Sequence, residues 1–126
     1  MRISALEACT GVSRHTLRFY EQEGLLSEVS RSENRYRNYS PKAVQRVQMI
    51  TQLKQLGFTL GEIREILDAL RADTMDCERG AKLMASKRAW VDSRIKELQA
   101  VSMMLAAEEQ RLMESARLHG ATGQCE

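Results

Sequence analysis

The sequence has few aromatic residues, one proline and two histidines among its 126 residues. Phenylalanine, tryptophan and tyrosine make up only 5% of the chain. This low share argues against one large core over the whole length and favours a small domain with an extension. With two histidines and no glycine-rich phosphate loop, we find no constellation of acid, base and nucleophile. The sequence therefore predicts a protein that is not an enzyme.

Long hydrophobic runs are also missing. No stretch approaches the roughly 18 apolar residues of a membrane-spanning helix, and no apolar segment follows Met1–Ser4 as it would in a secretory signal. Cys9, Cys77 and Cys125 are an odd number of thiols far apart in the chain. Their spacing argues against a disulfide framework and for reduced thiols. We therefore expect a cytoplasmic protein that binds no membrane.

Positive charge is present but unevenly distributed. The formal net charge is only +2, yet the stretch from Arg31 to Arg46 holds five basic residues and a single acid, Glu33. A local basic patch on a small domain indicates a polyanionic partner such as nucleic acid. The alternative is an ordinary solvated surface.

Residues 12–26 contain a helix start, a basic face and a glycine stop. Ser13 suits an N-cap because its hydroxyl can accept hydrogen bonds from the first helical turn. Gly24 can adopt the left-handed conformation that ends a helix. Arg14 and Arg18 are four residues apart and so lie on one face. The pattern predicts a helix with one side in a core and the other against an anion.

A preceding helix is predicted to begin at Ser4, because Ser4 and Glu7 have the spacing of a capping box. Cys9 would lie on its inner stripe as a small buried hydrophobe. Gly11 suits the tight turn that separates this helix from the next. A helix, a short glycine-containing turn and a second helix form a helix-turn-helix pattern.

Helical periodicity disappears between Ser27 and Tyr39. Residues 30–34 have turn chemistry and residues 35–39 alternate like a strand, which predicts a short hairpin, or wing, presenting arginines and tyrosines. Ser40 and Pro41 then predict a helix start, and this helix should end at Gly57. A second capping box at residues 59–62 opens a further helix that reaches about residue 70.

From about residue 76 to about residue 118 there is no proline and one glycine, which predicts a single long helix. Every seventh position is apolar along one seam, formed by Met84, Val91, Leu98, Leu105 and Leu112. One seam on a helix roughly 60 Å long cannot bury itself. The same helix of a second subunit, parallel or antiparallel, would cover it most simply. The alternative is a helix that folds back onto its own N-terminal domain.

The chain resembles the MerR family of bacterial transcription regulators, and most closely its divalent-metal-sensing branch. The resemblance rests on motif residues in family order: Thr10-Gly11-Val12-Ser13, Thr16-Leu17-Arg18-Phe19-Tyr20-Glu21, Gly24-Leu25-Leu26, Arg31-Ser32-Glu33-Asn34, Tyr36-Arg37, Tyr39-Ser40, Leu56-Gly57-Phe58-Thr59-Leu60 and Glu62-Ile63. It covers residues 1–70 closely and the long helix by pattern.

The resemblance implies an all-α fold with a small β-hairpin wing, in which a winged helix-turn-helix domain precedes a long dimerisation helix. The expected divisions are a DNA-binding domain at 1–70, a hinge at 71–75, an antiparallel coiled-coil helix at 76–118, and an effector-loop remnant or flexible tail at 119–126. A homodimer would bind a pseudo-palindromic promoter spacer in double-stranded DNA. It would switch transcription by RNA polymerase by bending and untwisting that spacer.

Position and chemistry predict the DNA contacts. Arg14, His15 and Thr16 open the second helix, where helix-turn-helix proteins reach base edges. The expected phosphate or groove-edge contacts are Arg18, Tyr20, Arg31, Tyr36, Arg37 and Tyr39. Arg35 stands where the family often has glycine or asparagine, so it could add a phosphate contact or face solvent. A structural salt bridge is the alternative for each arginine. Phe19 is expected in the core.

The effector is predicted from Cys77 at the start of the long helix. In divalent-metal sensors of the family, a cysteine there reaches a metal held by the other subunit, whereas sensors of monovalent coinage metals tend to have serine. The family's pair of loop cysteines is missing here, and residues 112–126 offer only His119 and Cys125. Cys77 of one subunit with His119 and Cys125 of the other would suit Zn, Cd, Pb or Hg.

Two alternatives to the metal site remain open. Cys77 would lie in the first helical turn, where the helix dipole favours the reactive thiolate, so the thiol could respond to oxidants or electrophiles. The other alternative is a regulator without a small-molecule effector. A purely structural coiled-coil protein would explain the long helix but not the arginine–tyrosine wing.

Overall fold

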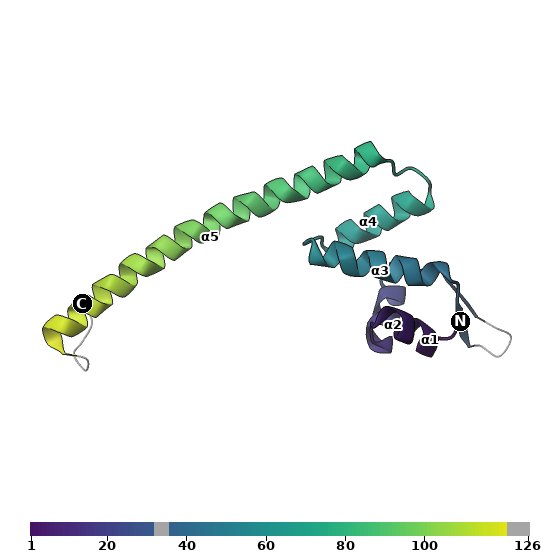
Figure 1. The fold of residues 1–126 in the computed structure, drawn as a ribbon, viewed down its shortest axis with the longest axis horizontal. Coiled ribbons are helices and arrows are strands. Elements are labelled where there is room, and N and C mark those ends of the chain that lie inside the picture. Colours follow the sequence, from purple (N-terminus) through teal and green to yellow (C-terminus); the bar gives the residue numbers. More distant parts are fainter. Residues whose placement is uncertain (32–35, 121–126) are drawn as a thin grey trace. The chain divides into compact units, whose positions relative to one another are not determined.

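The computed structural model describes residues 1–31 and 36–120, and the chain divides into two compact units, residues 1–80 and 81–126. Unit 1 contains, in order, α1 (Ile3–Thr10), α2 (Arg14–Gln22), β1 (Val29–Arg31), β2 (Arg37–Tyr39), α3 (Lys42–Gln55) and α4 (Leu60–Arg71) (Figure 1). The last helix, α5 (Cys77–His119), begins in unit 1 and makes up the described part of unit 2. This mainly helical fold with one small hairpin confirms the predicted fold class.

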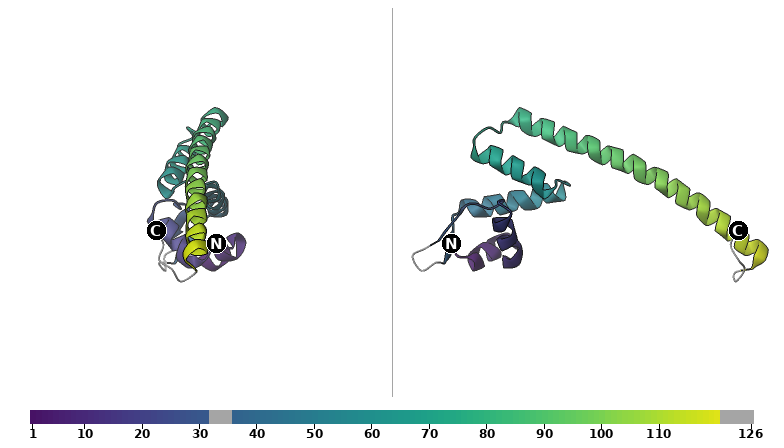
Figure 2. Two further views of the ribbon diagram at one scale, coloured as in Figure 1. Left: turned by 90° about the vertical axis from the view of Figure 1, so that its left-hand side faces the viewer. Right: turned by 180° about the vertical axis from the view of Figure 1, so that it is seen from behind.

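The core of unit 1 lies where α1, α2, α3 and α4 meet. Within this unit α1 packs against α2 and α3, and α3 packs against α4 (Figure 2). Every one of these helices buries apolar side chains there, and Leu25 and Leu26 from the segment after α2 join them. The buried helix residues include Leu6, Leu17, Val47, Ile50, Leu53, Ile63 and Leu67. Each fully buried leucine or isoleucine contributes about 1.5–3 kcal/mol relative to exposure. The core therefore fixes how α2 is presented.

The turn between α1 and α2 has the predicted local chemistry. Ser13 is the N-cap of α2, and its Oγ accepts a hydrogen bond from the Thr16 backbone N–H at 3.3 Å. Gly11 ends α1 with φ +71°, a left-handed conformation that costs glycine no Cβ clash. The second predicted capping box is also present, between Thr59 and Glu62 at the start of α4.

The predicted capping box at Ser4 is wrong. Helix α1 begins at Ile3, and its N-cap residue, Arg2, makes no side-chain capping bond. The Glu7 carboxylate accepts from the backbone N–H of Arg14 at 2.6 Å instead. Glu7 thus caps the neighbouring helix α2 rather than its own.

Two expected core residues are exposed. Cys9 lies on the surface, because α1 is only eight residues long and buries Leu6 alone. Phe19 is 39% exposed, because Leu17 and Tyr20 occupy the core-facing positions of α2. A short helix buries only a narrow stripe, and Cys9 and Phe19 lie outside it.

The wing is an antiparallel hairpin of β1 and β2. Val29 pairs with Tyr39, Ser30 with Asn38, and Arg31 with Arg37. The chain start lies against β2, where the Tyr39 N–H donates to the Met1 carbonyl oxygen at 2.7 Å. Figure 1 shows the N-terminus beside the wing strands.

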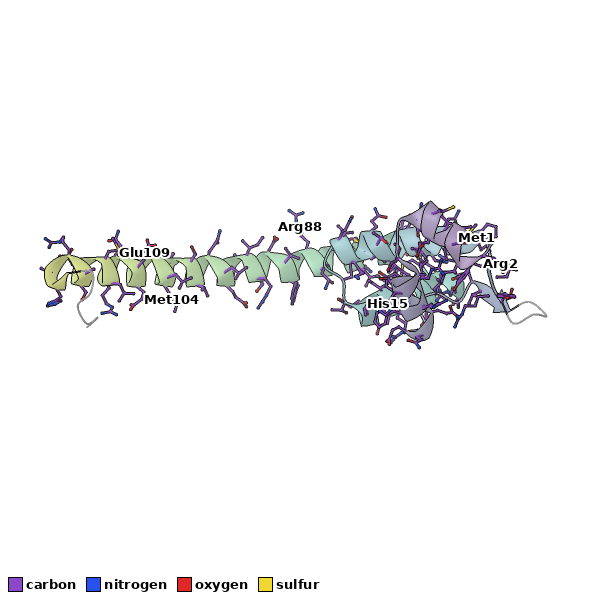
Figure 3. The ribbon with its side chains drawn as sticks, turned by 90° about the horizontal axis from the view of Figure 1, so that it is seen from below. Met1, Arg2, His15, Arg88, Met104 and Glu109 are labelled. Atoms are coloured by element: carbon purple, nitrogen blue, oxygen red, sulfur yellow. The ribbon has the colours of Figure 1, made fainter. Side chains whose placement is uncertain are left out.

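Helix α5 is a continuous helix of 43 residues with no buried side chain among them. Its predicted apolar seam is largely uncovered, and Leu98 and Leu105 are each more than 60% exposed. Figure 3 shows Met104 and Glu109 projecting from this helix. Among the described residues of unit 2, no other helix or strand covers it. Along the described residues, no helix is both long and apolar enough to cross a membrane.

Candidate nucleic-acid interface

The start of α2 presents polar side chains on one side and apolar ones on the other. Arg14, His15 and Arg18 are exposed, whereas Leu17 is buried in the core. Thr16 is half-buried, and its Oγ1 accepts from the Ser13 hydroxyl at 3.0 Å. Figure 3 shows His15 at the surface of unit 1. The predicted recognition helix therefore has a free basic face.

Glu7 orients the first of these residues. Its Oε2 accepts from the Arg14 backbone N–H and lies 3.7 Å from the Arg14 Nε. The Arg14 side chain is still 51% exposed, so this ion pair restrains the guanidinium without covering it. Exposed pairs of this kind contribute little stability, and the larger consequence is a defined starting direction for α2.

Glu21 joins α2 to the wing. Its Oε1 accepts from Arg37 Nε at 3.0 Å, and its Oε2 accepts from the Tyr39 hydroxyl at 3.1 Å. Burial raises the pKa of Tyr39, and the nearby Glu21 carboxylate raises it further, against the opposing effect of Arg37 and Arg18. One carboxylate therefore fixes the second wing strand against the recognition helix and aims Arg37.

The structure contradicts two of the predicted DNA contacts, Tyr20 and Tyr39, because both side chains are buried. Tyr20 is 3% exposed, and its ring packs in the core while Lys54 Nζ donates to its hydroxyl at 3.5 Å. Tyr39 is 0% exposed, and its hydroxyl is used by Glu21. Buried side chains with internal partners cannot reach a phosphate, so both residues leave the interface and act as structural supports.

Two further predicted contacts fall partly or wholly outside the described residues. The backbone of Arg31 pairs with Arg37 in the hairpin, but its side chain is not among the described ones. Arg35 lies outside the described residues altogether. Of the remaining wing residues, Tyr36 is 55% exposed and Arg37 is half-buried.

A cavity of about 320 Å³ lies between α1, α2 and the wing. It is lined by Arg2, Ile3, Ser4, Arg14, Arg18, Tyr36 and Arg37. The lining thus brings together three of the predicted contact arginines and adds Arg2, and none of the described residues in it is acidic. We call it the arginine pocket.

Sequence reasoning missed Arg2 as a functional residue. Its guanidinium lies over the Tyr36 ring, 4.4 Å from the centroid, so it belongs to the same surface as the wing. The available signal was a basic residue immediately before the first helix. Nothing in the local pattern, however, indicated that residues 2 and 36 would meet.

Glu28 supports the interface from behind, at the base of the wing. Arg46 Nε donates to its Oε1 at 3.3 Å, and Arg71 is bonded to the same carboxylate. Burial acts to raise the pKa of Glu28, but the hydrogen bond and charge of Arg71, with two backbone N–H groups, outweigh it and lower the pKa below its ordinary value. The folded state therefore stabilises the deprotonated, charged form of Glu28.

Two of the predicted effector residues, Cys77 and His119, lie at opposite ends of α5. Cys77 is exposed and is the first residue of α5, just after Asp76, whose Oδ1 accepts from the Arg79 N–H at 2.7 Å. His119 is the last residue of that helix, and Cys125 lies outside the described residues. Among the described residues, no group of three or more potential ligands could hold a metal ion.

Comparison with known proteins agrees with this geometry. The family described as "MerR HTH family regulatory protein" matches residues 1–70, and "MerR, DNA binding" matches residues 44–107. The chain belongs to the MerR family of helix-turn-helix transcription regulators.

Several relatives extend the match over most of the chain. The mercuric resistance operon regulatory protein of Bacillus cereus is 32% identical over 118 residues, which are 94% of this chain and 89% of the relative. The HTH-type transcriptional regulator CueR of Salmonella typhi is 33% identical over 107 residues, 85% of this chain and 78% of CueR.

Two solved structures share the fold. The transcription regulator PbrR691 of Ralstonia metallidurans CH34, in complex with lead(II), has a TM-score of 0.80 and 33% identity, covering 88% of this chain and 87% of that one. HiNmlR, a MerR family regulator lacking the sensor domain and bound to promoter DNA, has a TM-score of 0.60 and 28% identity, covering 94% of each chain.

Proposed function

We propose that this chain is a homodimeric regulator that binds a pseudo-palindromic promoter spacer and switches transcription by RNA polymerase by distorting that DNA. The observation that carries the proposal is one surface on which the exposed arginines of α2 meet those of the wing. Such a surface suits a polyanion, because arginine forms bidentate bonds with phosphate. The promoter-bound structure of HiNmlR, which this chain matches along 94% of its length, supports the same conclusion.

The roles of the interface residues follow from their positions. Arg14, His15 and Thr16 would reach base edges, since the first turn of a recognition helix enters the major groove. Arg18, Tyr36 and Arg37 would contact phosphates and set the register of the head on the duplex. The side chain of Arg31 and residue Arg35 stay proposed phosphate contacts on sequence grounds alone.

The dimer is inferred from the uncovered seam of α5. The seam residues Leu98, Leu105 and Leu112 stay at least one-third exposed in the single chain, and leaving such a stripe in water is unfavourable. A second copy of α5, antiparallel to the first, would cover it and would place two heads on a two-fold symmetric site. To activate transcription by distorting the DNA, the protein must then bind phosphates tightly at both half-sites.

We further propose that a divalent metal ion is the effector and that Cys77 is a ligand. The exposed thiol of Cys77, together with His119 and Cys125, offers the N/S donors that zinc, cadmium, lead and mercury prefer. Cys77 and His119 are the first and last residues of one long helix, so the set requires two subunits. The names of two similar proteins, one for mercuric resistance and one solved with lead(II), support a metal.

The exposure of Cys77 also favours a second candidate, a thiol switch. An exposed thiol in the first turn of a helix can react with oxidants or electrophiles without any metal. This alternative needs Cys77 alone and makes no use of His119 or Cys125.

DNA binding is tested by selecting duplexes from a random-sequence pool with the full-length protein. The proposal expects recovery of an inverted repeat, protected over two half-sites. Recovery of no duplex, or of sequences without two-fold symmetry, would contradict it.

The effector is tested by titrating the reduced protein with Zn²⁺, Cd²⁺, Pb²⁺ and Hg²⁺. Cys77→Ser and Cys125→Ser should each weaken binding by at least about tenfold, whereas the matched control Cys9→Ser should not. Equal affinity in the Cys77→Ser variant would overturn the metal site. A response of DNA binding to an alkylating agent, lost in Cys77→Ser but kept in Cys125→Ser, would support the thiol switch instead.

A further inference from the structure

The arginine pocket is lined by residues of the proposed recognition helix and wing and, in addition, by Arg2, which belongs to neither. We propose that it binds one phosphate of the DNA backbone, and that Arg2, held on the Tyr36 ring, is a ligand of that phosphate. The inference rests on the proposed DNA-binding function and adds to it a residue from outside both the recognition helix and the wing.

The charge of the pocket indicates an anion. Arg2, Arg14, Arg18 and Arg37 all line it, and among residues 1–31 and 36–120 no acidic side chain does. Of the four guanidinium groups, those of Arg14 and Arg37 form ion pairs with Glu7 and Glu21. Within the described part of the chain, no ion pair involves Arg2 or Arg18. A phosphate, with its negative charge and several acceptor oxygens, matches the positive charge and the N–H donors of the exposed Arg2 and Arg18 side chains.

The position of Arg2 is defined on two sides. Its backbone carbonyl accepts from the N–H groups of Ala5 and Leu6 at 3.0 and 3.1 Å, which fixes the residue to the start of α1. The preceding carbonyl, that of Met1, accepts from Tyr39 in β2. Figure 3 shows Arg2 beside the wing, at the end of unit 1 that holds the hairpin. Backbone hydrogen bonds to α1 and β2 therefore hold Arg2 in place beside the wing.

The contact with Tyr36 orients the guanidinium. A guanidinium 4.4 Å from a ring centroid is within the range of cation–π attraction. A cation–π contact of this kind uses none of the guanidinium N–H donors as a conventional hydrogen bond, so the contact with Tyr36 is compatible with binding a phosphate. The Tyr36 side chain is 55% exposed, so Arg2 gives it a partner that restrains it on the surface.

The inference predicts a specific loss in the Arg2→Ala variant. On a duplex selected by the parent protein, affinity should fall by about tenfold or more, because a charge-assisted bond is lost in each head. The slope of log affinity against log salt should fall by about 1.8, since each phosphate contact contributes about 0.9 and the proposed dimer has two heads. Lys96→Ala removes one exposed charge from α5 and should leave both quantities unchanged.

A double-mutant cycle tests the role of Tyr36. Arg2→Ala should lower the affinity for DNA by the same factor in a Tyr36→Phe background as in the parent, because phenylalanine keeps the ring. In a Tyr36→Leu background, Arg2→Ala should cause a several-fold smaller loss of affinity for DNA. Arg2→Lys should keep most of the salt slope but lose part of the affinity, because lysine keeps the charge without the planar fork.

Neutral methylphosphonate links placed one at a time along the selected duplex identify the phosphate. At one position in each half-site, the neutral link should weaken DNA binding by the parent protein more than it weakens binding by Arg2→Ala, which has already lost one ligand of that phosphate. If the parent binds the duplex and Arg2→Ala has the same affinity, salt slope and methylphosphonate pattern, this inference is wrong while the proposed function stands. If the parent binds no duplex, the proposed function fails as well.

Discussion

Arg71, the last residue of α4, holds both carboxylate oxygens of Glu28, the residue before the first wing strand. Its Nε donates to Oε1 at 3.0 Å and its Nη2 to Oε2 at 3.2 Å. The same Nη2 also donates to the Leu25 carbonyl at 2.6 Å. The segment between α2 and β1 is thereby tied to the helix that precedes α5. This ion pair therefore supports the position of the wing from the α4 side, in addition to the bonds that Glu21 forms with Arg37 and Tyr39.

The first prediction concerns acid stability. The pKa of Glu28 is lower in the folded state than its ordinary value of 4.5, so the unfolded state binds this proton more readily. The stabilisation is therefore complete above about pH 4.5 and is lost as pH falls through the lowered pKa. Glu28→Gln should lower the free energy of unfolding at neutral pH by about 2 kcal/mol and flatten the acid limb.

Urea unfolding at fixed protein concentration over a series of pH values measures this effect. Glu65→Gln is the matched control, because Glu65 is an exposed residue of α4. If the two variants lose the same stability and keep the same acid limb as the parent, the ion pair contributes nothing to the fold.

The second prediction separates a buried tyrosine from a DNA contact. Tyr39→Phe removes the hydroxyl that donates to Glu21, which should cost about 1 kcal/mol of stability. Its affinity for DNA should stay within about twofold of the parent, because the side chain does not reach the surface. Arg18→Ala should do the reverse, with little loss of stability and a salt slope lower by about 1.8 in the dimer. Filter binding and urea unfolding of both variants provide the comparison, and a large affinity loss in Tyr39→Phe alone would show that the burial argument is wrong.

The third prediction concerns sequence recognition. His15 is exposed in the first turn of α2, so His15→Ala should change which bases are selected at one or two positions in each half-site. A base contact of this kind discriminates by about 1–3 kcal/mol. Repeating the duplex selection with this variant measures the change. Unaltered preferences at every position would place His15 outside the groove.

The fourth prediction concerns the subunit contact. Leu98→Glu places a charge in the proposed seam of α5 and should produce monomers that bind DNA at least about a hundredfold more weakly. Met103→Glu is the matched control, because Met103 is 74% exposed and lies away from the seam. Sedimentation of both variants distinguishes them. A Leu98→Glu protein that sediments like the parent would exclude the seam as the interface.

Local sequence chemistry accounts for most of the fold. Ser13 and Thr59 have short side chains that cap the helix that follows, and such bonds span three residues, so spacing reveals them. The length of α5 could likewise be predicted, because the segment contains no proline and Gly80 is its one glycine. The same rule failed at Ser4 and Glu7, which have the spacing of a capping box, because Glu7 accepts from the backbone N–H of Arg14 on the next helix.

The interface was harder to predict because its geometry depends on contacts between distant residues. The exposure of Arg14 and Arg18 follows from helix periodicity. The burial of Tyr20 and Tyr39, however, depends on partners at Lys54 and Glu21, which no local pattern specifies. Arg2 was missed for the same reason. A tyrosine in a basic segment resembles a DNA contact until the packing around it is known.

The most direct test of the central claim is the affinity of the parent protein for its selected duplex, measured by fluorescence anisotropy across a salt series. A dimer that neutralises several phosphates through each arginine-lined head should lose affinity steeply, with a slope that Arg18→Ala and Arg2→Ala each make shallower. An affinity that does not change with salt, or a slope that both variants leave unaltered, would contradict the claim that this surface binds DNA.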